Sequence, residues 1–239
     1  MKRLMRGFVK FLILVVIAMS ALWFGMGYYF THIYKIADLV RNDVATQLQA
    51  HHVSFLKYDE IPVMYRNAVI ATEDRSFFTN QGIDVMGTLR AVFVDISGGQ
   101  PRQGGSTITQ QLIHNTILSD EAKSLSWKAR ETFYAIGLYD TMSKPETFEL
   151  YANVIYFGHG ATGLYQASQT YFGKSPSGLN DGELTMLAGL PNAPSVYDPY
   201  KNLTLARERQ SLVIQSMVDD GVVDKAQAEK IMNQPIRLK

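Results

Sequence analysis

RQGGSTITQQ, residues 102–111, is the stretch around which the rest of the chain is organised. It begins as a glycine-rich loop and continues as a run of hydroxyl and amide side chains. The paired glycines let the backbone approach a ligand closely and supply a positive φ where a turn needs one. Ser106 is a candidate N-cap for a following helix, whose first free N–H groups would then face an anion. The stretch therefore predicts a polar loop that leads into a helix beside a binding site.

Two acidic segments flank this stretch, ATEDRSFF at residues 71–78 and WKARE at residues 127–131. Glu73 and Glu131 are expected on different helices. Two acids around a cleft are what glycosyl chemistry requires, because one activates a nucleophile or protonates a leaving group while the other acts on charge elsewhere. Either Glu taken alone would usually be a solvated residue on a helix surface. Lys128, three positions before Glu131, then reads as its surface ion-pair partner.

Composition restricts the class of protein. The chain has 239 residues, a formal net charge of +1 and no cysteine. A near-neutral charge without a long basic block argues against nucleic acid as a partner. Because cysteine is absent, disulfides, cysteine-containing zinc sites and thiol nucleophiles are excluded. About 35 residues are assigned to a membrane segment, and the roughly 200 that are left suit one domain.

The N-terminal region predicts a membrane anchor. Residues 11–30, FLILVVIAMSALWFGMGYYF, carry no charge, and as a helix they span about 30 Å, the thickness of the hydrocarbon core. No small-residue cleavage pattern follows, so the segment reads as an uncleaved anchor rather than a removed signal; a buried core helix is the alternative. The residues that precede it include four cations, which place the N-terminal tail (1–10) in the cytoplasm and residues 31–239 outside: Lys2, Arg3, Arg6 and Lys10.

The rest of the chain reads as mainly helical, without an internal repeat or a convincing hairpin. Residues 31–54 are expected to form a stalk or a first domain helix, and residues 55–239 to form the domain. Glu73 and Asp74 are expected at the end of a helix, and Leu125, Ala129 and Phe133 mark an apolar helical stripe. Helical spacing and capping residues predict helices near the following positions: 63–72, 86–96, 107–117, 125–136, 143–151, 180–190, 205–218 and 225–232.

Five segments, in this order, resemble the motifs of monofunctional peptidoglycan glycosyltransferases. The same domain forms the polymerase half of bifunctional penicillin-binding proteins. The resemblance covers roughly residues 55–200, and the expected anchor fits it. The motifs are EDxxF at residues 73–77 with Gly82, GGSTITQQ at 104–111, KxxE at 128–131, ELYxNxIYFGxG at 149–160 followed by YFGK at 171–174, and LAGLPxAP at 187–194.

This resemblance implies a lysozyme-like helical fold with a membrane-associated small lobe, and an enzyme that joins lipid II into β-1,4-linked glycan strands. Glu73 would be the general base that deprotonates the acceptor 4-hydroxyl. That oxygen would attack the anomeric carbon of the growing chain, with inversion and loss of undecaprenyl diphosphate. Glu131 would hold the site in shape or assist the donor sugar. The implied substrate-binding residues are Asp74, Phe77, Arg102, Gly105, Ser106, Thr107, Gln110, Gln111, His114, Lys123, Lys128 and Asn153.

Four positions depart from the family pattern. Asn80 stands where the pattern has His, Trp127 where it has Arg, His114 where it has Lys, and Lys123 where it has Arg. Histidine is mostly neutral near pH 7 unless its pKa is raised, lysine lacks the bidentate fork of arginine, and tryptophan carries no charge. These departures predict weaker binding of the donor diphosphate, or compensation by basic neighbours, namely Arg102, Lys128 and Arg130.

The resemblance also implies a location and partners. The location is the bacterial cytoplasmic membrane, crossed once. The partners are lipid II, the growing glycan strand, membrane lipids, and transpeptidases or other wall-synthesis proteins, since no transpeptidase domain is expected after the last motif. The sequence shows no dedicated metal cage, and a divalent cation (Mg²⁺ or Mn²⁺) at the diphosphate is left open. Two alternatives are a lytic transglycosylase that cleaves glycan with a protonated acid, and an inactive tethered scaffold that binds lipid II.

Overall fold

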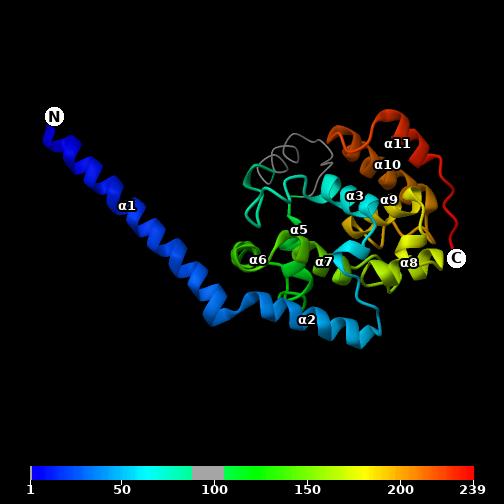
Figure 1. The fold of residues 1–239 in the computed structure, drawn as a ribbon, viewed down its shortest axis with the longest axis horizontal. Helices are drawn as coiled ribbons and strands as arrows, with labels where there is room; N and C mark the ends of the chain where they lie inside the picture. Colours follow the sequence, from blue (N-terminus) through cyan, green and yellow to red (C-terminus); the bar gives the residue numbers. More distant parts are fainter. Residues whose placement is uncertain (1, 88–104) are drawn as a thin grey trace.

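The computed structural model describes residues 2–87 and 105–239, and these residues fold almost entirely as helices (Figure 1). They contain no named strand, and an isolated antiparallel bridge joins Tyr156 to Thr162. The mainly α fold expected from the sequence is confirmed. Most of the helix expected at residues 86–96, and the glycine-rich loop before residue 105, lie outside the described residues.

Helix α1 (Lys2–Tyr28) projects from the body of the chain as a long rod (Figure 1) and continues into a π-helical segment, η1 (Tyr29–Tyr34). By length and composition, Val9–Tyr34 is the one candidate membrane span among the described residues. Its mean hydropathy is 2.2 and 0% of its most apolar window is buried. A core helix would instead be covered by the rest of the protein. The exposed apolar surface is therefore compatible with the anchor that the sequence predicts.

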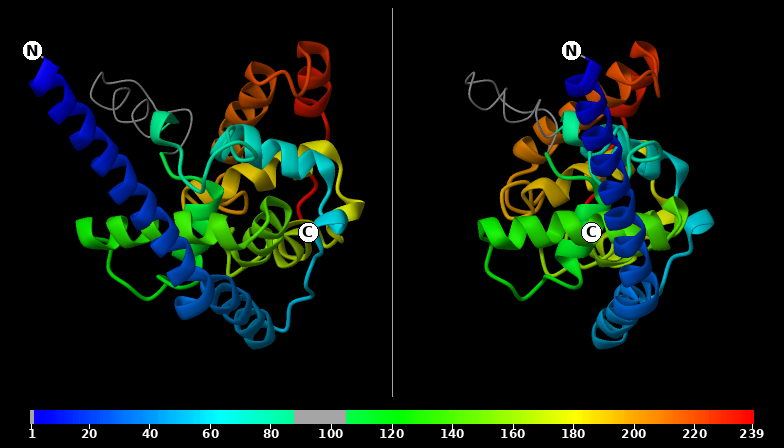
Figure 2. Two further views of the ribbon diagram at one scale, coloured as in Figure 1. Left: turned by 60° about the vertical axis from the view of Figure 1, so that its left-hand side comes forward. Right: turned by 90° about the vertical axis from the view of Figure 1, so that its left-hand side faces the viewer.

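Helix α2 (Ile36–His51) turns away from α1 and packs against α6 (Leu125–Thr141) and α7 (Lys144–Val154). Its buried residues, Ile36, Ala37, Val40 and Val44, recur at helical spacing. In both views of Figure 2, α2 lies at the opposite edge of the body from the C-terminal helices. Residues 31–54 thus contribute a helix that is part of the packed body.

The body consists of two groups of helices. In the first group, α3 (Val63–Glu73), α9 (Asp181–Gly189) and α10 (Leu203–Asp219) pack against each other. In the second group, α5 (Ile108–Asn115) packs between α6 and α7. Helix α8 (Leu164–Phe172) follows α7 and leads toward the first group, and α11 (Lys225–Met232) covers α10.

Helix caps explain several of these starts. Asn180 caps α9, and its side chain accepts a hydrogen bond from the Glu183 N–H while Glu183 reaches back to the cap. Asp224 caps α11 in the same way. Ser143 caps α7, which carries proline in its first turn. These caps confirm the helix starts predicted at the corresponding positions.

Helix α6 forms as predicted, but its buried face is not the apolar stripe seen in the sequence. Leu125 is 90% exposed and Phe133 is 39% exposed, whereas Trp127 and Glu131 are buried. The hydrophobic pattern predicted the wrong face because the buried face carries Glu131, and such a pattern assigns a charged residue to the surface. Phe133 instead lies beside Phe30 at the end of the apolar N-terminal region, with ring centroids 4.9 Å apart.

Candidate active site

Glu73 ends α3, and its carboxylate is held on both oxygens. Oε2 accepts a 2.8 Å hydrogen bond from Gln111 Nε2 on α5, and Oε1 lies 3.4 Å from Arg209 Nη2 on α10. The residue is only 6% exposed. Burial raises the pKa of Glu73, while the Arg209 cation and the Gln111 amide oppose that rise. The predicted base therefore lies in direct contact with the segment that follows the glycine-rich loop.

The two acids are connected through adjacent residues of α5. Gln111 donates to Glu73, and Gln110 Nε2 donates to Glu131 Oε2 at 3.3 Å. Tyr151 donates its hydroxyl to Gln111 Oε1 at 3.4 Å, which fixes that amide from the other side. One turn of α5 thus brings together two carboxylates that are far apart in the sequence.

The N-cap of α5 is Thr107, so the prediction that Ser106 caps this helix was wrong. The Gln110 N–H donates to Thr107 Oγ1 at 3.1 Å, and the Thr107 N–H donates to Gln110 Oε1 at 3.0 Å. A threonine followed three residues later by glutamine is the sequence signature of this capping box. Thr107 also donates its hydroxyl to the Gly82 carbonyl at 2.6 Å. The cap therefore fixes Gln110, and through it the contact with Glu131.

Lys128 contacts both Glu131, the second acid, and Ser106. Lys128 Nζ makes an ion pair with Glu131 and donates to Ser106 Oγ at 2.8 Å. Burial raises the pKa of Glu131, and the Lys128 ammonium opposes the rise. The Lys128 side chain is 42% exposed whereas that of Glu131 is 2% exposed. The predicted pair therefore exists, and it joins a partly exposed lysine to a buried carboxylate.

Asp74 joins the end of α3 to the start of α5. Its Oδ2 accepts from the Ile108 N–H at 3.0 Å, and its Oδ1 accepts from Asn80 Nδ2 at 2.8 Å. Asn80 Oδ1 accepts from Lys144 Nζ at 2.8 Å and from the Gly82 N–H at 3.0 Å. Burial raises the pKa of Asp74, and these hydrogen bonds oppose the rise. Asn80, at the position where the family pattern has His, therefore holds the helix-linking carboxylate in place.

Lys144 gives this network a predicted pH dependence. Burial lowers the pKa of Lys144 from 10.5 to about 8, and the Asp74 carboxylate opposes the fall. Between these values the unfolded chain binds more protons than the folded one, so the contribution of Lys144 to stability rises as the pH increases. We expect Lys144→Met to flatten the plot of unfolding free energy against pH over this interval. Urea unfolding at several pH values measures this slope, and Lys230→Met, at an exposed lysine, is the control. An unchanged slope would contradict the assignment.

Three of the four departures from the family pattern lie together beside Lys128. The His114 ring meets the Trp127 indole at an interplanar angle of 84°, with centroids 5.0 Å apart, and Lys123 Nζ lies 5.9 Å from the indole ring. Burial lowers the pKa of His114, and the charges of Lys123 and Lys128 lower it further. The imidazole is therefore neutral at neutral pH. Trp127 is buried, and its Nε1 has no hydrogen-bond partner among the described residues.

The remaining predicted site residues belong to the frame of the site or lie outside the description. Phe77 is 0% exposed and packs against Phe148. Asn153 is buried, and its side chain pairs with both the N–H and the carbonyl of Leu56, at 2.9 and 2.8 Å. Gly105 begins the second described part of the chain, and Arg102 lies outside it.

Arg209 was missed by the sequence analysis. It is 5% exposed, and its Nε donates to the Gly189 carbonyl at 3.3 Å. The sequence nevertheless indicates that Arg209 is buried, because it lies three positions after Ala206 and four before Val213. This spacing puts it on the apolar face of its helix. A cation on a buried face needs a partner, and Glu73 supplies it.

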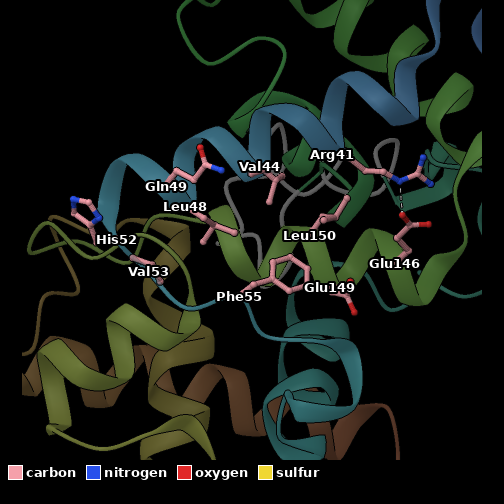
Figure 3. A pocket seen from close by; sticks show the side chains of 11 residues that line it. Arg41, Val44, Leu48, Gln49, His52, Val53, Phe55, Glu146, Glu149 and Leu150 are labelled. Atoms are coloured by element: carbon pink, nitrogen blue, oxygen red, sulfur yellow. Dashed lines mark hydrogen bonds and ion pairs between the residues drawn. The ribbon is translucent and has the colours of Figure 1, made fainter.

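A separate hollow lies between α2 and α7. It is an apolar groove of about 770 Å³. Figure 3 shows it lined by Leu48, Phe55 and Leu150, with the 2.6 Å ion pair between Arg41 and Glu146 at one end. The groove uses the side of α7 that meets α2, whereas both candidate acids bind to α5. The carboxylates, rather than this groove, define the candidate active site.

Comparison with known proteins places this site in a family. Residues 41–218 match the family model described as Transglycosylase. The matched region begins within α2, ends within α10, and contains both acids, both glutamines and Arg209. The chain belongs to the transglycosylase family, and its resemblance to the peptidoglycan glycosyltransferases is confirmed.

Similar curated proteins include Penicillin-binding protein 1A from three bacteria. The identities are 40% over 181 residues for Haemophilus influenzae, 41% over 181 for Vibrio cholerae and 40% over 185 for Aquifex aeolicus. These alignments cover 76, 76 and 77% of this chain but 21, 22 and 25% of the relatives. The chain thus spans about a fifth to a quarter of their length. A solved structure of the Haemophilus influenzae protein aligns with a TM-score of 0.46 and 22% identity, covering 78% of this chain and 18% of that one.

Proposed function

We propose that this chain polymerises lipid II into β-1,4-linked glycan strands and releases undecaprenyl diphosphate. The observation that carries the proposal is the pair of glutamines on α5, which hold Glu73 and Glu131 separately in a chain of the transglycosylase family. One acid makes an ion pair with a buried arginine, and the other makes an ion pair with a partly exposed lysine. The two acids therefore have different surroundings, as two different roles require.

In the proposed reaction Glu73 is the general base. Its carboxylate takes the proton from the 4-hydroxyl of the acceptor sugar, and that oxygen forms a bond to the anomeric carbon of the donor. The bond between this carbon and the diphosphate oxygen breaks, which inverts the configuration at the carbon. Arg209 and Gln111 both favour the ionised carboxylate that this step needs.

The leaving group is an anion, so positive charge serves it better than a proton donor does. Lys128 is positioned for this role because its side chain is partly exposed and its ammonium is held by Glu131 and Ser106. His114 contributes no charge at neutral pH. Among the described residues no three His, Asp or Glu side chains form a group that could hold a metal ion. A divalent cation, if the reaction uses one, would accordingly be bound mainly by the substrate diphosphate.

The proposed arrangement in the cell follows from α1. We propose that α1 crosses the cytoplasmic membrane once, with its basic N-terminal end inside and residues 31–239 outside. Lipid II then reaches the site from the outer leaflet. The proposed partners are the growing glycan strand, membrane lipids, and transpeptidases or other wall-synthesis proteins.

Incubation of the purified full chain in detergent with labelled lipid II tests this function. We expect consumption of lipid II and the appearance of glycan strands that a muramidase digests. A chain that consumes no lipid II but shortens the glycan of purified sacculi would instead be the lytic alternative. Burial raises the pKa of Glu73, and this is the direction that the acid catalyst of the lytic alternative needs. Consumption of neither substrate would favour the scaffold.

A further inference from the structure

Arg209 reaches Glu73 from a helix outside the five motifs. Its guanidinium bridges two groups, the Gly189 carbonyl, which accepts from Nε at 3.3 Å, and the Glu73 carboxylate, 3.4 Å from Nη2. Both side chains of this ion pair are 5% exposed. Opposite charges that are removed from water interact strongly, and they are fixed in place by their other contacts.

The close approach of α10 to α9 depends on a glycine. A Cβ added at Gly189 would lie 2.9 Å from Arg209 Cγ and 3.2 Å from Val213 Cγ2. The absent side chain at Gly189 therefore leaves the space in which the Arg209 stem lies. The same residue also accepts the hydrogen bond that aims the guanidinium.

We propose that Arg209 is a positioning residue that holds the Glu73 carboxylate, against Gln111 on its other side, in the orientation and charge state of a general base. The proposal rests on the proposed function of Glu73. Arg209 touches neither of the reacting sugars in this account. It acts through Glu73, and Gln111 acts through the second carboxylate oxygen.

The charged and titratable groups around Glu73 favour this role. Asp74, which follows Glu73 directly, and the buried Tyr65 of α3 lie nearby, and α7 contributes the buried Tyr151. Helix α9 carries its acidic residues at its N-terminal end, whereas its C-terminal residue, Gly189, meets Arg209. Arg209 is accordingly the cation that offsets the burial of Glu73.

The test compares Arg209→Gln with Arg209→Lys in lipid II polymerisation across the pH range. Without the cation, the Glu73 carboxylate is less favoured, so its ionisation moves to higher pH. We expect the acidic limb of the kcat profile to move up by about one pH unit in Arg209→Gln. Arg209→Lys should return the limb to within a few tenths of a unit of the original position, with kcat about tenfold lower and KM within twofold. The exposed Arg237→Gln serves as the control.

The acidic limb of the kcat profile against pH distinguishes a positioning role from a merely structural one. The proposal would be overturned if this limb lay at the wild-type pH in both variants, or if Arg209→Gln kept the wild-type kcat. Where Arg209→Gln does not fold, Arg209→Lys decides alone. An ammonium cannot bridge both Gly189 and Glu73 as the guanidinium does, so a wild-type kcat at every pH would overturn the proposal.

A second measurement does not need activity, and it separates this inference from the proposed function. Thermal unfolding of Glu73→Gln, Arg209→Gln and the double variant forms a double-mutant cycle. Each single change leaves one partner buried without its counterpart, so we expect the double variant to lose less Tm than the two single losses combined. Additive losses would show that the two side chains are not coupled and would overturn the proposal even if the chain polymerises lipid II.

Discussion

Glu73→Gln is expected to lower the rate of lipid II polymerisation by roughly 10²–10⁴-fold, the usual contribution of a positioned general base. Glutamine has nearly the shape of glutamate but cannot accept the proton of the acceptor hydroxyl. Substrate affinity should change much less, because the carboxylate is only 6% exposed and its hydrogen bonds are made to Gln111 and Arg209. The loss should therefore appear in kcat rather than in KM.

The structure adds a stability effect to this variant. The carboxylate of Glu73 accepts from two donors, Gln111 Nε2 and Arg209 Nη2, on different oxygens. A glutamine amide has one acceptor oxygen, so its NH₂ group must face one of these donors. Removing one partner of a buried ion pair costs on the order of 3–5 kcal/mol. Rates therefore need to be expressed per folded molecule, with the folded fraction taken from the unfolding curve.

The exposed Glu208→Gln on α10 is the matched control, because it removes a carboxylate of the same kind from the surface. We expect polymerisation by this variant to equal that of the wild type. If folded Glu73→Gln also polymerises lipid II at the wild-type rate, the base has been misassigned. A strain that keeps normal wall synthesis with Glu73→Gln as its copy of the protein would favour the scaffold alternative.

Local patterns predicted the positions of the main chemical groups. Glu73 lies at the end of α3 because the preceding apolar residues and Pro62 define that helix, and Lys128 meets Glu131 because residues three apart share a helix face. The cap at Asn180 was likewise local. Each of these features depends on residues within one or two helical turns, and such short-range relations can be recognised in the sequence.

The features that the sequence did not predict depend on how helices are placed relative to each other. Gln110 and Gln111 are neighbours, yet a helix turns by about 100° per residue, so they point to different acids on α6 and α3. Trp127 is buried on α6 although the apolar stripe of that helix faces outward. Arg209 meets Glu73 across 136 positions of sequence. Only the packing of α3, α5, α6 and α10 creates these contacts.

Gly82→Ala is expected to destabilise the chain by about 3 kcal/mol or more. Gly82 has a φ of +85°, and a Cβ built there would lie 2.3 Å from the Ala135 carbonyl oxygen and 2.9 Å from its carbon. A left-handed conformation costs an L-residue roughly 1–2 kcal/mol, and the clash adds to this because backbone atoms of α6 cannot turn aside. About 3 kcal/mol corresponds to a fall in Tm of roughly 6–12 °C for a domain of this size. Thermal unfolding followed by circular dichroism measures it.

This substitution should also disturb the active site, since Gly82 is hydrogen-bonded both to the N-cap of α5 and to Asn80, the partner of Asp74. Its carbonyl accepts from Thr107 Oγ1, the cap of α5, at 2.6 Å, and its N–H donates to Asn80 at 3.0 Å. Gly160→Ala is the matched control, because Gly160 has a φ of +73° but no atom within 4 Å of an added Cβ. It should show only the backbone cost of about 1–2 kcal/mol. Equal losses of Tm in the two variants would mean that the contact with Ala135 relaxes, and a folded Gly82→Ala with wild-type kcat would mean that the cap of α5 does not depend on this turn.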